Sequence, residues 1–510
     1  MTTPNFPFLP DHNDLIANRY QKAEALRAAG INPYPADYDV DHLAAEVLAK
    51  KDELIASGAQ VSVLGRAFTI RAFGKAAFFH LRDRSGQIQV YLKQGVLSDG
   101  DFKLYKEFLD AGDLVGVKGR VFTTKTGETT IEAATFSILT KSVRQLPEKW
   151  QGLTDVEIRY RQRYLDMIAN PDVVEVFRSR SRIVSAMRRF LDASGFMEVE
   201  TPMMQPLYGG ANARPFMTHH NALDMPLYMR IAPELYLKRL VVGGLHRVYE
   251  INRNFRNEGI STRHNPEFTM LELYAAGWNA RNMMSFVEEI VRESARGGMG
   301  RTEFTISGEQ VDFAKPFARV RMTDVVRNVL GFDIDWDLPF EEARRRVGTL
   351  GIPSTVQTTD ALVIFLFEEH CEKTLVQPTF IIEFPKSVSP LAKSVEGRAE
   401  VADRFELYAN GVEIANGYSE LNDPREQYQR FEEQLQRRER GDLEAVGQID
   451  EDYVRALEYG MPPTAGLGIG IDRLVMLMTG AQSIRDVILF PLMRPMAAEQ
   501  VAAQEDDKSK

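Results

Sequence analysis

Short apolar runs separated by turn residues dominate residues 61–140. Hydrophobic and polar side chains alternate along five such runs, which predicts five β-strands. The segment Asp101–Ala111 has helical spacing instead and lies between the third and fourth runs. Five strands with one helix inserted at this point predict a five-stranded Greek-key barrel.

The rest of the chain mixes helical and strand patterns. Helical spacing with Gly30 as a stop predicts a helix over 13–30, and a second helix is expected from 40 to about 57. The turn-rich stretch that follows the barrel predicts a linker, and the polar ends predict disorder. The predicted division is 1–145 for the N-terminal helices and barrel, 146–155 for the linker, 156–504 for a second domain with a mainly helical insertion around 317–372, and 505–510 for a disordered tail.

Residues 254–274 predict a strand, a long polar loop and a returning strand. Because side chains alternate along a strand, Arg256 and Glu258 are expected on one face. The returning strand is expected to present Phe268, Met270, Glu272 and Tyr274 on one face. Such a surface fits a triphosphate, an aromatic base and a cation together. A half-buried hairpin with its charges in water explains the pattern equally well.

Asn410-Gly411 is a strong signal for a type I′ hairpin turn. With these two residues as the loop, Tyr408 pairs with Glu413, and Glu406 becomes a diagonal neighbour of Glu413 at roughly 7–8 Å between Cα atoms. Two carboxylates at that separation can share a hard cation, and Mg²⁺ with ATP phosphates is the expected guest. Two exposed acids are the alternative, but like charges side by side are unfavourable without a counter-ion.

The same hairpin predicts that Glu406, Tyr408, Glu413 and Ala415 share one face. Asn416, Tyr418 and Glu420 then fall on the opposite parity. For both sets to face one pocket, a β-bulge is needed, and we expect it near Asn416-Gly417.

Three further stretches carry a family resemblance. The run F-R-N-E followed by R-H-N-P-E-F-T (255–269) resembles motif 2 of class II aminoacyl-tRNA synthetases, G-L-G-I-G-I-D-R-L (466–474) resembles their motif 3, and G-F-M-E-V-E-T-P (195–202) resembles their motif 1. The whole chain resembles bacterial lysyl-tRNA synthetases. The resemblance implies an α+β protein, with an N-terminal OB-fold barrel that binds the anticodon and a catalytic domain on an antiparallel sheet flanked by helices. It also implies a homodimer built largely on motif 1.

The resemblance further implies ATP-dependent activation of L-lysine, with Mg²⁺, and transfer to tRNA(Lys). The ATP site is expected to contain Arg256, Glu258, His264, Phe268 and Arg473, with Arg256 and Arg473 as catalytic residues. The lysine site is expected to contain Gly210, Glu234, Glu272, Tyr274, Asn416, Tyr418 and Glu420. Glu406 and Glu413 are expected to carry the metal, and Arg71, Phe78, Gln89 and Glu128 to read the anticodon.

Chemistry supports lysine among the related amino acids. Glu234, Glu272 and Glu420 suit a cationic side chain, whereas an aspartate pocket needs a basic residue in that place. Two alternatives remain: a non-catalytic RNA-binding relative, and a protein-lysylating paralogue, which normally lacks the N-terminal barrel. No G-x-x-x-x-G-K-[ST] occurs, so the P-loop route to ATP is absent.

Composition sets bounds on these hypotheses. A content of 44% hydrophobic and 26% charged residues is ordinary for a soluble globular protein. The net charge of −10 argues mildly against nucleic acid, although residues 61–146 carry more basic than acidic side chains. The single Cys371 fits a reducing compartment and is expected to be buried and inert. No secretory signal begins the sequence, and the longest apolar run, 361–367, is too short for a bilayer, so we expect a cytoplasmic protein with no membrane contact.

Overall fold

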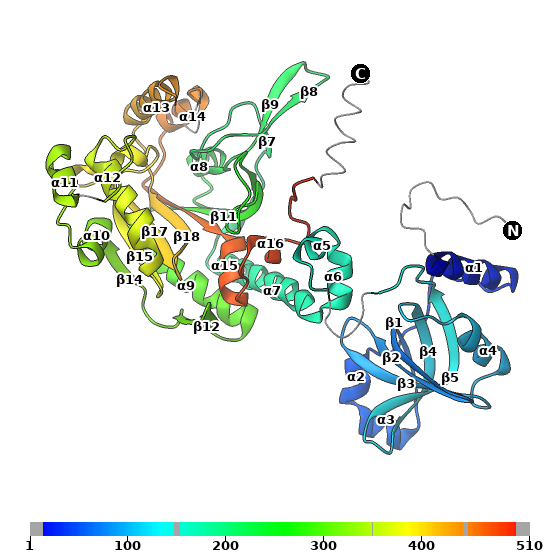
Figure 1. The fold of residues 1–510 in the computed structure, drawn as a ribbon. Coiled ribbons are helices and arrows are strands. Elements are labelled where there is room, and N and C mark those ends of the chain that lie inside the picture. The colour runs from blue at the N-terminus through cyan, green and yellow to red at the C-terminus, as the bar shows by residue number, and fades with distance from the viewer. Residues whose placement is uncertain (1–13, 147–152, 349, 442–446, 496–510) are drawn as a thin grey trace. The chain divides into compact units, whose positions relative to one another are not determined.

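The computed structural model describes residues 14–146, 153–348, 350–441 and 447–495. The chain divides into two compact units, Met1–Gly152 and Leu153–Lys510, and Figure 1 shows the elements of each. The predicted tail at 505–510 and most of the predicted linker at 146–155 lie outside the described residues. The finer domain limits given above stay predictions.

The first unit contains the predicted barrel. Its strands close in the order β1-β2-β3-β5-β4, with β3 and β5 parallel and the other neighbours antiparallel. They are β1 (Gln60–Phe73), β2 (Ala76–Arg82), β3 (Gln87–Lys93), β4 (Leu114–Thr123) and β5 (Thr129–Thr140), with α4 (Asp99–Phe108) between β3 and β4. Alternate side chains point inward, so Val63, Phe79 and Phe136 are buried in the barrel core.

Within the described residues, three helices precede the barrel. They are α1 (Asp14–Ala28), α2 (Ala44–Ala49) and α3 (Lys51–Ser57). The helix expected over 40–57 therefore begins later and is broken at Lys50, whose φ of −101° and ψ of 16° are not helical. The two pieces follow the barrel surface, α2 against β3 and α3 against β4.

The second unit is built on one large sheet in the order β14-β15-β17-β18-β19-β11-β10-β6. The strands are β14 (Ala318–Arg321), β15 (Thr379–Pro385), β17 (Arg398–Ala409), β18 (Val412–Ser419), β19 (Thr464–Gly470), β11 (Glu267–Ala276), β10 (Arg247–Phe255) and β6 (Met197–Glu198), and β16 (Ser394–Val395) pairs with β17. Neighbours are antiparallel except at the two ends, where β14 is parallel to β15 and β6 to β10. The α+β fold class is thus confirmed.

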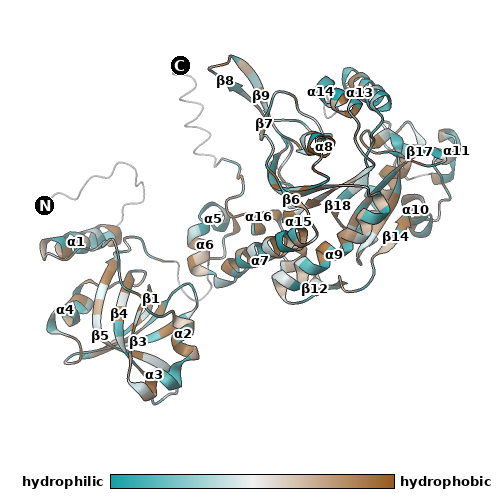
Figure 2. Cartoon of the chain, turned by 180° about the vertical axis from the view of Figure 1, so that it is seen from behind, coloured by the Kyte–Doolittle hydropathy of each residue, from teal (hydrophilic) through white to brown (hydrophobic). Residues whose placement is uncertain are grey.

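Three helices cover one face of this sheet: the long helices α7 (Pro171–Ala193) and α9 (Ala280–Met299) and the shorter α15 (Ile471–Thr479). Brown apolar segments alternate with teal polar ones along α7 and α9 (Figure 2). A Cβ on Gly298 of α9 would lie 2.5 Å from the Ile183 side chain of α7, so the glycine permits the close approach of the two helices. Pro171 is the first residue of α7, where its missing N–H and fixed φ suit the start of a helix.

The opposite face of the sheet is open to the candidate site. Leu271 and Leu273 of β11 pack in the core under the helices. Tyr274, on the other parity, packs with residues of α8 (Glu234–Val242) instead. Alternation along β11 therefore sends its acids and aromatics to the site and its leucines to the core.

The structure contains both predicted hairpin regions, but some of their residues lie in other places than expected. Asn410 and Gly411 both have positive φ, 51° and 63°, as a type I′ turn requires. The bulge lies at Ile414, opposite the step from Leu407 to Tyr408, rather than near Asn416-Gly417. The expectation that Ala415 shares the face of Glu406 is therefore wrong. The extra residue at Ile414 lies before Ala415 and moves its side chain to the other face of the sheet.

The strand before motif 2 is also corrected. β10 runs from Arg247 to Phe255, so Arg256 and Glu258 lie in the loop beyond its end rather than on a strand face. Their placement is set by the loop: the Arg256 backbone N–H donates to the Pro266 carbonyl (2.9 Å).

The remaining elements surround the sheet. The helices are α5 (Val156–Arg161), α6 (Arg163–Ala169), α10 (Met322–Leu330), α11 (Phe340–Val347), α12 (Thr359–Leu366), α13 (Pro424–Glu439), α14 (Glu451–Glu458) and α16 (Ile484–Val487), with a π-helical turn at Phe367–Cys371 and 3₁₀ turns at Glu372–Thr374 and Lys386–Val388. Small sheets join β7 (Met204–Gln205), β9 (Met225–Met229) and β8 (Met217–His220), and β12 (Glu303–Ile306) with β13 (Glu309–Asp312). Cys371 is fully buried in the core of the helical insertion, as expected.

Candidate active site

Two cavities adjoin on the open face of the large sheet. One has a volume of about 310 Å³ and the other about 190 Å³. Both are lined by Arg256, Met270, Glu413, Asn416 and Gly468. The shared residues form the boundary between the cavities, so a ligand group at Arg256 is accessible from both sides.

Arg256 projects into this boundary. Its Nε is buried and has no hydrogen-bond partner, and its guanidinium lies 5.1 Å from the centroid of the Phe268 ring. Burial lowers the pKa of the guanidinium, and the charges of Glu258 and Glu413 oppose that shift. An arginine with an unpaired donor at the meeting point of two cavities is suited to an anionic group.

The smaller cavity contains a cluster around Arg473, the second residue after Ile471 begins α15. Arg473 donates to Glu413 Oε2 (3.0 Å) and to His264 Nε2 (3.2 Å), and the other ring nitrogen of His264 lies 3.0 Å from Ser261 Oγ. Burial and the charge of Arg473 lower the pKa of His264, so its ring is neutral at neutral pH. Glu258 and Phe268 also line this cavity. The five expected ATP residues are therefore brought together.

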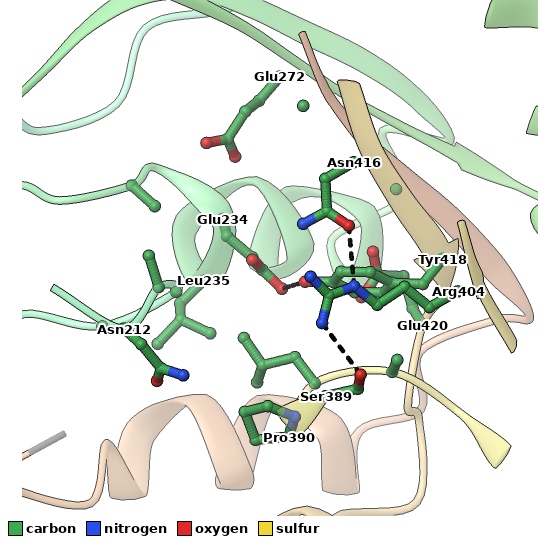
Figure 3. Close-up of a pocket in the computed structure, with 18 of the residues that line it drawn as sticks. Asn212, Glu234, Leu235, Glu272, Ser389, Pro390, Arg404, Asn416, Tyr418 and Glu420 are labelled. Atoms are coloured by element: carbon green, nitrogen blue, oxygen red, sulfur yellow. Dashed lines mark hydrogen bonds between the residues drawn. The ribbon is translucent and has the colours of Figure 1, made fainter. Parts of the chain in front are cut away.

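The larger cavity is acidic (Figure 3). Glu234, Glu272 and Glu420 all line it, and each is at most 5% exposed. Burial and the charge of Glu234 raise the pKa of Glu272 to about 8. Tyr274 donates to Glu272 (3.3 Å), and Tyr418 donates to Glu234 (2.6 Å).

Glycines make room for these acids. An added Cβ on Gly466 would lie 2.0 Å from Glu420 Oε1 and 2.6 Å from the Tyr274 ring. The glycines of motif 3 up to Gly470 are thus part of strand β19, where the missing side chains leave space for their neighbours. Gly210 also lines the cavity and has a φ of +86°, with an added Cβ 3.0 Å from the Glu234 side chain.

Arg404 crosses the middle of the larger cavity (Figure 3). It donates to Asn416 Oδ1 (3.0 Å), to Glu406 Oε1 (2.6 Å) and to Ser389 Oγ (3.1 Å). Because its Oδ1 is occupied by Arg404, Asn416 presents its NH₂ group to a ligand. Sequence reasoning missed Arg404, although its position two residues before Glu406 on a strand places both on one face.

Glu406 and Glu413, the two residues expected to carry the metal, both line the larger cavity. Burial raises the pKa of Glu406 to about 7, opposed by Arg404 and reinforced by the charge of Glu413. Tyr408 donates to Glu406 Oε2 (2.7 Å). Among the described residues no group of three or more acidic, histidine or cysteine side chains forms a metal cluster. The pair fits Mg²⁺, which takes its other ligands from phosphate and water.

The barrel carries the other candidate residues on one face. Gln89 donates to Glu128 Oε2 (2.7 Å), and His80 Nε2 lies 3.1 Å from Glu128 Oε1. The rings of Phe78 and Tyr91 stack with centroids 4.6 Å apart. Arg71, the fourth expected residue, is paired with Phe78 across strands β1 and β2. All four expected side chains therefore come from neighbouring strands or from the end of the β4–β5 loop.

Comparisons with known proteins agree with this geometry. The family described as "tRNA synthetases class II (D, K and N)" matches residues 155–494, and "OB-fold nucleic acid binding domain" matches residues 61–139. The lysine–tRNA ligase of Carboxydothermus hydrogenoformans is 52% identical over 95% of this chain and 98% of its own length. Those of Pelotomaculum thermopropionicum and Enterococcus faecalis are each 51% identical over 95% of this chain, covering 96% and 98% of their own lengths.

The antiparallel sheet, the three motifs and the family match define a class II aminoacyl-tRNA synthetase with an OB-fold. Within that class the chain belongs to the lysine–tRNA ligase family, as the sequence resemblance predicted. None of the helices in the described part of the chain has the length and apolar character to cross a bilayer.

Proposed function

We propose that the chain activates L-lysine with ATP and transfers it to the 3′-terminal ribose of tRNA(Lys). The observation that carries this function is the junction of an acidic cavity and an arginine-containing cavity at Arg256. The acidic cavity suits a ligand with ammonium groups, and the second suits a polyphosphate. The lysine–tRNA ligase relatives, about half identical over nearly the whole chain, support the same assignment.

Two group transfers make up the reaction. A carboxylate oxygen of lysine attacks the α-phosphorus of ATP, the bond to the bridging oxygen breaks, and pyrophosphate leaves. A ribose hydroxyl of the tRNA then attacks the lysyl carbonyl, and AMP leaves. Neither step needs a covalent nucleophile from the protein, because positioning and charge stabilisation lower both barriers. Arg256 bridges the lysine carboxylate and the α-phosphate, where negative charge grows.

The other residues of the smaller cavity hold ATP. Phe268 stacks on the adenine base of ATP, and Glu258 lies at the adenine end of the bound nucleotide. Arg473 holds the γ-phosphate, with neutral His264 beside the outer phosphates. This assignment is supported by the contact between Arg473 and His264 (3.2 Å), which keeps both side chains at one end of the cavity.

The acidic cavity holds lysine. Glu234 and Glu420 bind the ε-ammonium and the ring of Tyr418 covers the aliphatic stem. Glu272 takes the α-ammonium and Asn416 the carboxylate. Tyr274 and Gly210 complete the wall.

Glu406 and Glu413 hold Mg²⁺ in this proposal. Bound there, the ion supplies positive charge that offsets the phosphate oxygens of ATP. Glu413 of β18 pairs with Tyr408 of β17, two residues along that strand from Glu406, and this closeness supports the assignment. Arg404 and Tyr408 orient Glu406 through one hydrogen bond to each of its oxygens.

The barrel binds the anticodon of tRNA(Lys). Phe78 stacks on a base, while Arg71, Gln89 and Glu128 hydrogen-bond its edge. The bond from Gln89 to Glu128 supports this role, because it fixes both polar groups beside an aromatic ring. Replacing Phe78 by alanine tests it: charging of tRNA is expected to weaken while lysine activation without tRNA stays unchanged.

The working form is a homodimer in the cytoplasm. Apolar side chains near motif 1 and the C-terminal segment support a second copy as partner. Met197, Met204, Leu489 and Phe490 are 54%, 55%, 43% and 70% exposed. Sedimentation of the full-length protein tests this: a monomer at micromolar concentration would contradict the proposal. A single cysteine, buried and inert, is consistent with the reducing cytoplasm.

ATP–pyrophosphate exchange with each of the twenty amino acids, with magnesium and without tRNA, tests the proposed activity. Exchange with lysine alone is the expected result. Exchange with aspartate or asparagine instead would contradict the assignment of Glu234, Glu272 and Glu420 to the side-chain pocket. Absence of exchange with every amino acid would favour a non-catalytic RNA-binding role.

A further inference from the structure

Lys238 is a lysine buried behind the wall of the acidic cavity. It lies one helical turn after Glu234 on α8, and it is 0% exposed. Its ammonium contacts the carboxylates of Glu234 and Glu420 and lies 5.5 Å from the centroid of the Tyr418 ring. Lys238 does not line the cavity itself. Its two acidic partners therefore stand between its charge and the space for a ligand.

The charges of this cluster do not balance without Lys238. Two carboxylates that are buried side by side do not both stay ionised without a cation, because burial and mutual repulsion favour a shared proton. Burial raises the pKa of Glu420, and the ammonium of Lys238 opposes that rise. Among the described residues, Lys238 is the one cation that forms an ion pair with Glu420.

We propose that Lys238 is a positioning residue for the lysine substrate: a fixed counter-ion that keeps Glu234 and Glu420 ionised and directed at the ligand's ammonium group. Lys238 acts through these two carboxylates and does not touch the substrate. The proposal rests on the proposed function, because the ligand it concerns is lysine.

The groups that face this cluster come from four regions of the catalytic unit. They are Glu234, Lys238 and Arg239 on α8, Glu272 and Tyr274 on β11, Tyr418 and Glu420 in and just after β18, and Tyr453 on α14. Burial raises the pKa of each of the three tyrosines, which therefore stay neutral. Arg239 is directed away from the acids, since it pairs with Asp450. Burial also raises the pKa of Glu272 and Glu420, so protons that are gained or lost here belong to carboxylates.

Replacing Lys238 by methionine removes the charge and keeps most of the apolar stem. The Glu234–Glu420 pair then takes up a proton, which lysine has to displace when it binds. The kcat/KM for lysine in pyrophosphate exchange is expected to fall relative to wild type by about a further tenfold for each pH unit towards acid. The KM for ATP is expected to stay unchanged, because the smaller cavity is untouched.

The barrel offers a matched control. Lys141 is also fully buried and also bound to two carboxylates, those of Asp110 and Asp113. Lys141→Met removes the same kind of ion pair, so it is expected to lower the melting temperature of the protein. Exchange kinetics with lysine are expected to keep the wild-type pH profile. Lys238→Arg, which restores the charge, is expected to recover the wild-type profile in large part.

Each outcome decides the proposal. A loss in Lys238→Met that is equal at pH 6.5 and 8.5, or that appears equally in the KM for ATP, would assign Lys238 to packing and overturn it. If Lys238→Met does not fold, Lys238→Met/Glu420→Gln decides. A folded double variant with no added pH dependence supports the charge role, and an unfolded one contradicts it. Failure of the proposed function is distinct, because wild type itself would then show no lysine-dependent exchange.

Discussion

The two cavities share a wall but differ in the sign and burial of the charged residues that line them. In the acidic cavity the carboxylates are buried and their charge is offset from behind by Lys238. The smaller cavity is lined by cations instead, Arg256 and Arg473, and the charge of Arg473 is offset by Glu413, which lines the same cavity. Removing the cation that pairs with a buried carboxylate has a large effect, because a carboxylate removed from water has little else to stabilise its charge. The acidic cavity is therefore expected to select its ligand more strictly than the smaller one.

Arg256 lines both cavities, so its loss should affect the reaction of both substrates rather than the binding of one. Arg256→Ala is expected to lower kcat for lysine-dependent exchange by about 10²–10³-fold, because charge growing on the α-phosphate loses its partner. Stopped-flow and steady-state exchange measure the effect. Arg296→Ala, which removes an exposed arginine on α9, is the control and should match wild type. A loss confined to the KM for ATP would contradict the bridging role.

Glu420→Gln tests the acidic cavity alone. It keeps the shape and removes one buried charge, so the KM for lysine is expected to rise about 100-fold. The KM for ATP should change little. Isothermal titration with lysine in the absence of ATP gives the same comparison at equilibrium. An equal rise in both KM values would mean that the two cavities do not separate the substrates as proposed.

Arg473→Ala tests the smaller cavity alone. A charge-assisted contact to phosphate is lost, and the KM for ATP is expected to rise about 30-fold while that for lysine stays nearly unchanged. Arg473→Lys keeps the charge but loses the planar geometry, so it should recover only part of the loss. Full recovery would show that a point charge suffices at this position.

Much of the difference between the two cavities could be predicted from the sequence, because local patterns determine which side chains face the site. Alternation along β11 placed Glu272 and Tyr274 on one surface, and the Asn410-Gly411 turn fixed the pairing of Tyr408 with Glu413. The bulge needed to bring Asn416 to the same face was predicted, but two residues too late, since both positions satisfy the parity argument.

What the sequence did not reveal depends on contacts between distant segments. Arg404 contacts Ser389, and Lys238 contacts Glu420. These partners are far apart in the sequence, so no periodic pattern predicts the contacts. Lys238 had one local signal, its i+4 spacing from Glu234, which is as typical of an exposed helix pair as of a buried one. The sequence shows the glycines of motif 3 but not their neighbours in space. Only the structure shows that the Glu420 carboxylate lies where a side chain at Gly466 would be.

The smallest expected effect concerns pH. Burial and Glu234 raise the pKa of Glu272 to about 8, so this acid is protonated in the empty cavity at neutral pH. An ammonium ligand prefers the ionised form, which is reached only as the pH rises through about 8. The kcat/KM for lysine is therefore expected to rise, by up to about tenfold per pH unit, from pH 6.5 to 8.

Glu272→Gln isolates the residue responsible. The variant cannot ionise at this position, so its kcat/KM for lysine should be lower and should lose this rise, while its KM for ATP keeps the wild-type pH dependence. If the rise persisted in Glu272→Gln, another group of the cavity would be the source, and Glu420 would be the next to replace. If the kcat/KM for ATP showed the same rise, the pH effect would belong to Glu406, whose pKa is also raised by burial, and the two cavities would differ less than their charges imply.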